Sequence, residues 1–398
     1  MSTLRVDGIR HNSATSDAIT TVADGTCTAK LTSVGGGGLS HRNKVINGAM
    51  AISQRGSSFT NITGNSGDTY TLDRFKIQMN ALDQAVVTVS QDSSAPDGFA
   101  KSLKIQCTTT ETSVESSEHA RLIYDGEAFD FTDIGFGTSS AKKITVSFWV
   151  KSNLTGTWGM NFWRGDANRS NLRTYTINSA NTWEHKVITL VEDTTGGGVN
   201  SDNGFGLRIN WGLATGANYA QSHSLDTWHS FEQQYFYPYD ARNTNLFSST
   251  SNNFYLTGVQ LEVGDTATSF EHRSIGEELT RCYRYYRRFG ANGALPTPAP
   301  YKRFSIGYAP SNTSIRFPFQ LDPPMRINPV NSNFSKSGGF SIQPGSIGSY
   351  TLNCDDNSCS VDMLVALMGN TSVTSGTGSA VSLHANNDTS AYIEISAE

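Results

Sequence analysis

The sequence lacks long apolar segments. No run approaches the roughly 18 consecutive apolar residues of a membrane-spanning helix. Residues 1–7 also lack the apolar stretch of a secretory signal peptide. We therefore expect a protein that is synthesised in the cytoplasm and is not inserted into a membrane.

Charged residues are also scarce. They make up 16% of the 398 residues, and the formal net charge is −5. Nucleic-acid binding requires clustered lysines and arginines that contact phosphates. The basic cluster that is present, Arg281 to Arg288, alternates with tyrosines on a predicted helix, where a solvated face or acidic neighbours explain it. We expect no nucleic-acid partner.

Cysteine is rare, and the five cysteines are widely spaced. An odd and scattered set does not indicate a disulfide framework. Cys354 and Cys359 could close a small loop, but a metal site there would need two more ligands, which the sequence does not indicate. We expect buried or neutral thiols, no metal and no cofactor.

Sequence motifs of catalysis are absent as well. The chain contains neither a Gly-x-Ser-x-Gly elbow nor a His-Glu-x-x-His motif, and the glycine run 35–38 is not followed by the residues of a phosphate-binding loop. We therefore expect a protein that is not an enzyme and has no catalytic residues. One alternative stays open, because two carboxylates that hydrolyse a glycosidic bond can meet across strands without any sequence motif.

Short segments of alternating apolar and polar residues are abundant. In residues 143–151, the side chains of Ile144, Val146, Phe148 and Val150 face one way and those between them face the other. This alternation is typical of strands that pack one face on a core. The composition, 37% hydrophobic and 10% aromatic, argues against disorder. We predict an all-β protein.

Shifts in pattern and composition divide the chain into four predicted parts. They are an N-terminal extended arm (1–45), a central jelly-roll β-sandwich (46–273), one connecting helix with a Pro-rich linker (274–300), and a smaller C-terminal β-sandwich (301–398).

Local signals support the arm and the helix. A hairpin turn is predicted at residues 23–25, between two short apolar segments. Ser274, followed three residues later by Glu277, forms a capping box. Helical spacing of apolar residues then predicts a helix from Ile275 to Phe289.

Aromatic residues gather in the central part. All six tryptophans lie within residues 149–228, and the irregular stretch 218–239 is rich in tyrosine and phenylalanine. Sugar rings stack on aromatic rings beside polar groups that bind their hydroxyls. The alternative is that these aromatics fill the core or a subunit interface. Our candidate glycan-binding residues are Trp149, Trp158, Trp163, Trp228, Tyr235 and Tyr237.

A series of short motifs runs in fixed order through residues 45–290. They are Asn47-Gly48-Ala49-Met50, Gln54-Arg55-Gly56, Tyr70-Thr71-Leu72-Asp73-Arg74-Phe75, Val146 to Ser152, Thr182-Trp183-Glu184, and the seam from Thr257 through Phe270-Glu271-His272-Arg273 to Tyr286. This ordered set resembles a domain of structural fibre or appendage proteins of tailed bacteriophages, marine ones especially. Residues 1–7 and Asp24-Gly25-Thr26 are similar to the virion-attachment start of such proteins.

More distantly, the Asn47-Gly48 opening and the segment 254–264 resemble carbohydrate-binding modules of families 4 and 9. Those modules often hold a structural calcium, partly through an acidic residue in the closing strand. Here Thr257-Gly258 stands at that place, so the resemblance does not carry calcium over.

The resemblance implies a virion protein, of the tail or a capsid appendage, that is made in the host cytoplasm. Its arm would bind a phage tail or capsid protein, its sandwiches would contact host-surface polysaccharide, and the chain would form a homotrimer. Two alternatives stay open. One is a tailspike-like glycan depolymerase, and the other is a purely structural capsid or neck decoration protein.

Overall fold

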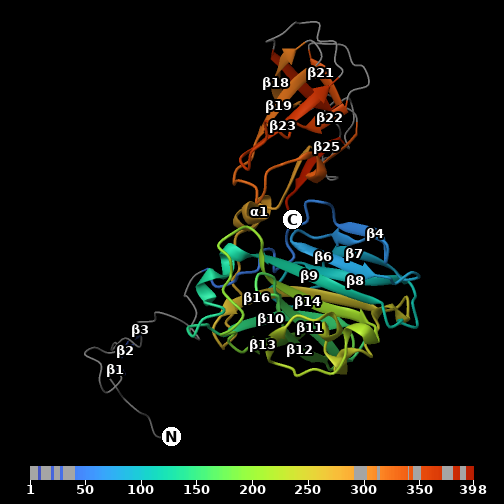
Figure 1. Cartoon of the computed structure of the whole chain (residues 1–398), viewed down its shortest axis with the longest axis vertical. Coiled ribbons are helices and arrows are strands. Elements are labelled where there is room, and N and C mark those ends of the chain that lie inside the picture. Colours follow the sequence, from blue (N-terminus) through green and yellow to red (C-terminus); the bar gives the residue numbers. More distant parts are fainter. Residues whose placement is uncertain are drawn as a thin grey trace.

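The structure is a computed structural model. It describes residues 8–9, 19–21, 27–29, 41–290, 303–311, 314–338, 340–343, 351–369, 380–385 and 391–398. The strands in these ranges form five sheets (Figure 1). Within the described residues, no helix is long and apolar enough to span a membrane.

Two sheets pack face to face as the central sandwich. The six-stranded sheet has the order β13-β10-β16-β8-β7-β4, and the seven-stranded sheet has the order β15-β12-β11-β14-β9-β6-β5. The strands are β4 (Ser58–Thr63), β5 (Asp68–Tyr70), β6 (Phe75–Asn80), β7 (Val86–Asp92), β8 (Ser102–Thr109), β9 (His119–Glu127), β10 (Ile144–Ser152), β11 (Gly156–Arg164), β12 (Arg169–Ile177), β13 (Glu184–Leu190), β14 (Phe205–Thr215), β15 (Trp228–Ser230) and β16 (Asn253–Val263). Short 3-10 helices connect them at Ala128–Ile134, Ala217–Tyr219, Gln233–Tyr235, Tyr239–Ala241 and Leu246–Ser248.

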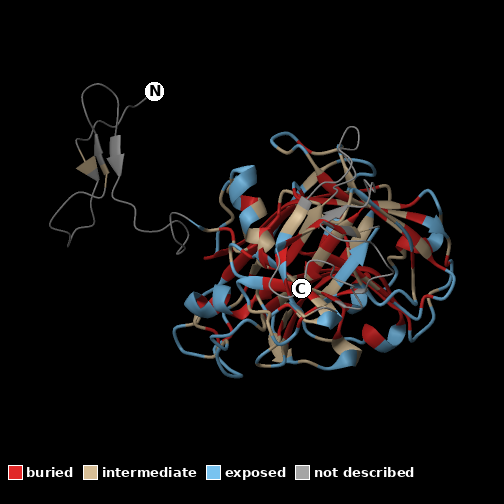
Figure 2. Cartoon of the chain, turned by 90° about the horizontal axis from the view of Figure 1, so that it is seen from above, coloured by how far each residue is buried: buried red, intermediate tan, exposed pale blue. Residues whose placement is uncertain are grey.

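The alternation in the sequence builds the core between these sheets. Ile144, Val146, Phe148 and Val150 of β10 are fully buried, and Trp211 of β14 meets them from the other sheet, with its ring centre 6.0 Å from that of Phe148. Burying one such side chain contributes roughly 1.5–3 kcal/mol. Figure 2 shows buried residues concentrated on the strands and exposed residues on the surrounding loops.

The connecting helix is shorter than the sequence predicts. α1 spans Ile275–Tyr283, and the following β17 (Tyr286–Gly290) occupies the end of the segment predicted as helix up to Phe289. The hydroxyl of Ser274 caps the first turn, as expected. Beyond α1 the helix prediction was wrong, because β17 pairs along its whole length with β25 (Tyr392–Ser396), the last strand of the chain. Local periodicity does not reveal so distant a partner.

A smaller sandwich follows α1. Its six-stranded sheet has the order β21-β24-β18-β19-β23-β22, and its three-stranded sheet has the order β17-β25-β20. The remaining strands are β18 (Arg303–Ser311), β19 (Ser314–Gln320), β20 (Phe334–Ser337), β21 (Phe340–Gln343), β22 (Thr351–Cys354), β23 (Met363–Gly369) and β24 (Ala380–Ala385), with a 3-10 helix at Asn331–Asn333. Phe317, Leu364 and Ile393 belong to a core that is separate from that of the central sandwich.

The arm contributes a sheet of its own. Its strands are β1 (Gly8–Ile9), β2 (Ile19–Thr21) and β3 (Cys27–Ala29), in the order β1-β2-β3. β2 and β3 pair antiparallel, with Thr21 opposite Cys27, and the turn predicted at residues 23–25 lies outside the described residues. The predicted fold class is confirmed: an all-β protein with an arm, a central sandwich, one connecting α-helix among the described residues, and a smaller C-terminal sandwich.

Charged side chains, one of them fully buried, join the two sandwiches. The carboxylate of Glu398, whose side chain is fully buried, lies 2.5 Å from Nη2 of Arg55 and accepts a hydrogen bond from the Arg74 amide. Arg326 of the smaller sandwich donates to the backbone carbonyl of Asn203, 3.1 Å away. A buried charge that loses its partner is strongly destabilising, so these contacts favour one relative placement of the two sandwiches.

Candidate functional site

A row of large side chains crosses the outer face of the six-stranded sheet. Lys151 of β10 is paired with Tyr255 of β16, which is paired in turn with Lys104 of β8. Trp183, directly before β13, completes the row, with its ring centre 6.0 Å from that of Tyr255. The ammonium of Lys151 lies 4.1 Å from the Tyr255 ring centre, and that of Lys104 lies 5.4 Å from it. Cation–π attraction stabilises this arrangement.

A second aromatic group lies two residues along the strands. The ring centre of Trp149 on β10 is 5.1 Å from that of His185 on β13. Beside it, the register of β16 shifts around Gly258, whose φ is +62°. A Cβ at Gly258 would lie 2.9 Å from Trp149 and 2.7 Å from Phe99. Glycine is therefore required for both rings to lie against this backbone.

Phe99 continues the second group toward α1. Its ring centre lies 4.9 Å from that of Phe270 and 5.2 Å from that of His272. These rings border a pocket of about 220 Å³ that is also lined by Lys101. We call Phe99, Trp149, Trp183, Tyr255 and Phe270 the aromatic strip; all five side chains are half-buried.

The aromatic strip suits a ligand with flat apolar faces and polar edges. Paired strands hold two of its rings, Trp149 and Tyr255, in place, and each half-buried ring leaves part of its surface available for stacking. Lysine ammonium groups at its border can donate hydrogen bonds. None of the five strip residues carries a carboxylate.

The sequence candidates are only partly on this surface. Trp149 belongs to the aromatic strip. Trp158 is fully buried in the core, with its ring centre 5.2 Å from that of Phe254. Tyr237 is 1% exposed and packs over Gly212 on the seven-stranded sheet. A ring without an exposed face cannot stack on a sugar, so the predictions for Trp158 and Tyr237 were wrong.

The other three candidates are half-buried near the edge of the seven-stranded sheet. Trp163 stacks on Phe231, with ring centres 4.6 Å apart and an angle of 16°. Trp228 donates its indole N–H to a backbone carbonyl at 2.8 Å. The ring centre of Tyr235 lies 4.6 Å from that of His223. These residues contact protein on at least one side, and a glycan contact at them stays a prediction.

Sequence reasoning missed most of the strip. Tyr255 alternates outward in β16, so its orientation could have been read from the same pattern that identified the core. Trp183 and Phe270 lie outside the strands, and Phe99 lies in the loop between β7 and β8. No local signal shows that these residues meet, because strand pairing brings them together.

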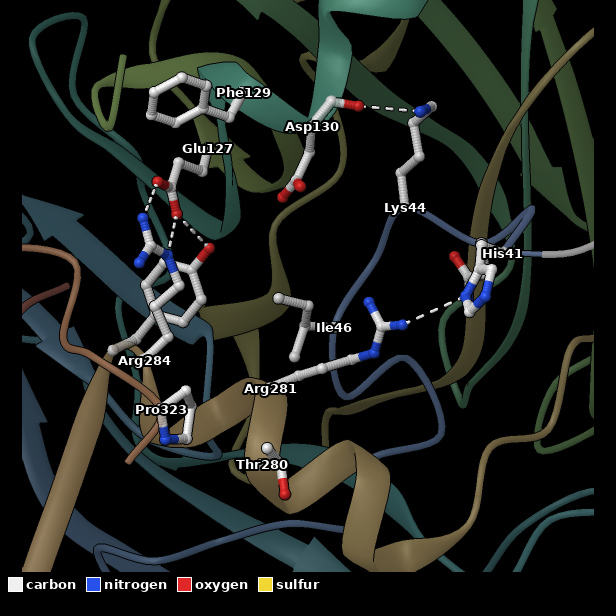
Figure 3. A pocket seen from close by; sticks show the side chains of 12 residues that line it. His41, Lys44, Ile46, Glu127, Phe129, Asp130, Thr280, Arg281, Arg284 and Pro323 are labelled. Carbon is white, nitrogen blue, oxygen red and sulfur yellow. Dashed lines mark hydrogen bonds and ion pairs between the residues drawn. The ribbon is translucent and has the colours of Figure 1, made fainter. Parts of the chain in front are cut away.

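A larger pocket, of about 560 Å³, lies where α1 meets the central sandwich. Figure 3 shows its charged lining, in which most groups already bind one another. Glu127 accepts hydrogen bonds from Nε of Arg284 at 2.8 Å and from the Tyr285 hydroxyl at 2.7 Å. Lys44 donates to the backbone carbonyl of Asp130 at 2.8 Å. The contacts of Glu127 hold the residues that directly follow α1 against the central sandwich.

The lining of this pocket includes two acidic residues, Glu127 and Asp130. Burial, and then the charge of Glu127, raise the pKa of Asp130, which is the direction that a general acid requires. Glu127, by contrast, is buried and held by Arg284 and Tyr285. Its acceptor positions are thus engaged in structural contacts.

One group of carboxylates among the described residues could hold a cation. Oxygen atoms of Asp83, Glu111 and Glu118 lie within 4.8 Å of one another, and oxygen ligands suit Ca²⁺. Burial, and then the charges of the neighbouring carboxylates, raise the pKa of Glu118. The amides of Gln84 and Ala85 donate to Glu111. These hydrogen bonds account for Glu111 without an ion.

Comparison with known proteins assigns no family. No family model and no curated protein matches the chain. The enzymatically active domain of tailspike protein 4 from bacteriophage CBA120 is 12% identical over 56% of this chain and 21% of that chain, with a TM-score of 0.29.

Two similar structures come from Clostridium thermocellum. A family 11 carbohydrate-binding module, in complex with a mixed-linked tetrasaccharide, is 10% identical over 55% of this chain and 99% of that chain, with a TM-score of 0.25. The CBM22-1–GH10 modules of xylanase 10B, complexed with xylohexaose, are 12% identical over 59% of this chain and 33% of that chain, with a TM-score of 0.25. Similarities this low assign no ligand to this chain.

Proposed function

We propose that this chain is a non-catalytic glycan-binding protein of a bacteriophage fibre or appendage. The observation that carries the glycan-binding part is the aromatic strip. Its five rings come from five separate segments of the chain and share one outer face of a sheet. Solvent-facing sides of antiparallel sheets usually carry polar side chains. Half-exposed aromatic groups of this kind mark surfaces that a ligand or partner covers.

The sequence resemblance to fibre proteins supports the other part of the proposal, that the chain is attached to a phage particle. In this view the arm binds a tail or capsid protein of the phage, and the sandwiches face the host surface. A homotrimer would present three copies of the strip. Linking several weak sites raises the overall affinity well above that of a single site, so recognition needs no single tight contact.

The test separates binding from hydrolysis. The purified full chain is applied to a glycan array and incubated with bacterial surface polysaccharides, and new reducing ends are measured. We expect binding without new reducing ends. Trp183→Ala and Trp149→Ala should each weaken binding roughly fivefold, since an aromatic stacking contact contributes about 1 kcal/mol. Tyr239→Ala, which removes an exposed ring outside the strip, is the matched control and should bind normally.

Other outcomes select the alternatives. New reducing ends that disappear in Asp130→Asn would favour a depolymerase that uses the pocket beside α1. A silent array, together with a strip that is covered when chains assemble, would favour a purely structural decoration protein. Glycan binding that persists unchanged in both tryptophan variants would contradict the proposed site.

A further inference from the structure

Three lysines without ion pairs border the aromatic strip. Lys104 and Lys151 flank Tyr255 in the cross-strand row, and Lys101 lines the pocket beside Phe99. No salt bridge joins any of the three to a carboxylate within the described ranges. Three other lysines of the sandwich, Lys44, Lys76 and Lys186, are paired with acids, whereas Lys142 and Lys143, at the far end of β10, have no salt bridge among the described residues. In a chain with a net charge of −5, this face is therefore locally cationic.

The ammonium groups of Lys151 and Lys104 repel each other. Burial is the main cause that lowers the pKa of Lys151; Asp92 on β7 opposes this shift, and the charge of Lys104, a smaller effect, adds to it. The carboxylate of Asp92 accepts a hydrogen bond from the Ser94 amide at 2.7 Å. Lys151 donates to the Ser94 hydroxyl at 2.6 Å, which leaves donors for a ligand. An anion at this place would reduce the repulsion between the lysines.

We propose that the aromatic strip binds a polysaccharide whose sugars carry carboxylate groups. The inference rests on the proposed function and narrows it to acidic glycans. Sugar rings stack on Trp183 and Tyr255, and sugar carboxylates accept hydrogen bonds from Lys151 and Lys104. Lys151 on β10 and Lys104 on β8 are separated by β16, a distance between strands of roughly 10 Å. An extended acidic polysaccharide that crosses these strands can therefore contact both lysines. Charge-assisted hydrogen bonds are about twice as strong as neutral ones, which sets the preference for acidic sugars.

The experiment compares polymers that differ only in charge. Affinities of the full chain are measured for alginate, polygalacturonate and hyaluronate, each beside its carboxyl-reduced form, with dextran as the neutral polymer and dextran sulfate as a non-carboxylate polyanion. We expect at least one acidic polymer to bind, its reduced form to bind at least fivefold more weakly, and added salt to weaken binding.

Lysine variants locate the site. Lys151→Gln and Lys104→Gln should each weaken binding of the acidic polymer by up to about fivefold. Lys143→Gln is the control, because Lys143 is exposed and lies just before the far end of the same strand, about 26 Å from Lys151. Circular dichroism confirms that all three variants fold.

Each remaining outcome overturns the inference. Equal binding of a polymer and its reduced form, or equal binding of dextran sulfate, excludes carboxylate recognition. Acidic binding that Lys151→Gln and Lys104→Gln leave unchanged excludes this site. A neutral glycan that binds through Trp183 and Trp149 overturns only the acidic preference and keeps the proposed function. Absence of binding to every polymer, together with a silent array, overturns both.

Discussion

Gly258 determines how closely two rings of the aromatic strip lie on the sheet. Gly258→Ala places a Cβ at 2.7 Å from Phe99 and 2.9 Å from Trp149, at a φ of +62° that L-residues rarely adopt. We expect a loss of roughly 1–3 kcal/mol in the free energy of unfolding, measured in urea, and weaker glycan binding because both rings must move.

Gly276 provides the control for that substitution. It lies in α1, and a Cβ there meets nothing within 4 Å. Gly276→Ala should leave binding unchanged and raise the free energy of unfolding by at most about 1 kcal/mol. Equal stability of the two alanine variants would contradict the strain assigned to Gly258.

Asp125 gives the protein a specific sensitivity to acid. Burial opposes its ionisation, but Arg208 at 2.5 Å and Lys76 at 3.0 Å outweigh burial and lower the pKa of Asp125 to about 2. The ordinary pKa of aspartate in an unfolded chain is about 4. The carboxylate therefore stabilises the fold above pH 4, by on the order of 2 kcal/mol, and this contribution is lost as the pH falls toward 2.

Asp125→Asn tests this assignment. The variant should be less stable than the wild type near neutral pH, because half-buried Arg208 loses its carboxylate partner and buried Lys76 keeps only Asp68. The difference in free energy of unfolding should shrink between pH 4 and pH 2, where the wild-type carboxylate also becomes protonated. Urea titrations across this range measure it, and a difference that stays constant with pH would rule out the depressed pKa.

At the residue scale, the sequence predicted which side chains face the core only in segments whose alternation already indicated a strand. The alternation in β10 correctly separated Trp149 from its buried neighbours. Trp158 was a wrong candidate because its inward register with Met160 and Phe162, in the segment that forms β11, was not recognised. Contacts such as that between Trp183 and Tyr255 depend on strand pairing, which a single sequence does not encode locally.

At the scale of elements, the turn from β22 to β23 brings two thiols together. The sulfurs of Cys354 and Cys359 lie 2.8 Å apart. The hydrogen bond with Cys354 lowers the pKa of Cys359, and the thiolate is the form that attacks disulfides. We expect oxidised glutathione to close this loop: Cys359 displaces one glutathione thiol, and Cys354 then displaces the second.

Mass spectrometry and thermal unfolding check this outcome. The product should have lost two hydrogens, and a loop this short should add roughly 2 kcal/mol of stability on the chain-entropy account. Cys354→Ser should instead keep a glutathione adduct on Cys359. Buried Cys282 should stay unmodified. A wild-type protein that accumulates a stable glutathione adduct would refute the expected closure.

Most strands were predictable from the sequence, and the main exception is the end of α1. β6, β7, β8, β10 and β14 coincide with alternating segments in the sequence, because each packs one face on a local core. The end of α1 was misjudged because tyrosines and arginines after Tyr283 fit a helical period as well as a strand. Pairing of β17 with β25 decides between them, and β25 lies about a hundred residues later in the chain.

At the scale of the whole molecule, Glu398 joins the two sandwiches. Its buried carboxylate binds Arg55 and the Arg74 amide. Glu398→Gln should lower the free energy of unfolding by about 3 kcal/mol, because it leaves buried arginines without their anion. Glu277→Gln, which breaks only an exposed pair with Arg281, should cost less than about 0.5 kcal/mol. Chemical denaturation compares them, and similar effects would show that Glu398 is not an anchor.

The central claim is that the outer face of the six-stranded sheet holds the glycan. A crystal structure of the full chain, soaked with an oligosaccharide of the polymer that binds best, tests it most directly. We predict sugar rings on Trp183, Tyr255 and Trp149, with carboxylates beside Lys151 and Lys104, and no cleaved bond. An oligosaccharide bound instead beside Asp130 near α1, or on Trp163 of the other sheet, would contradict the account.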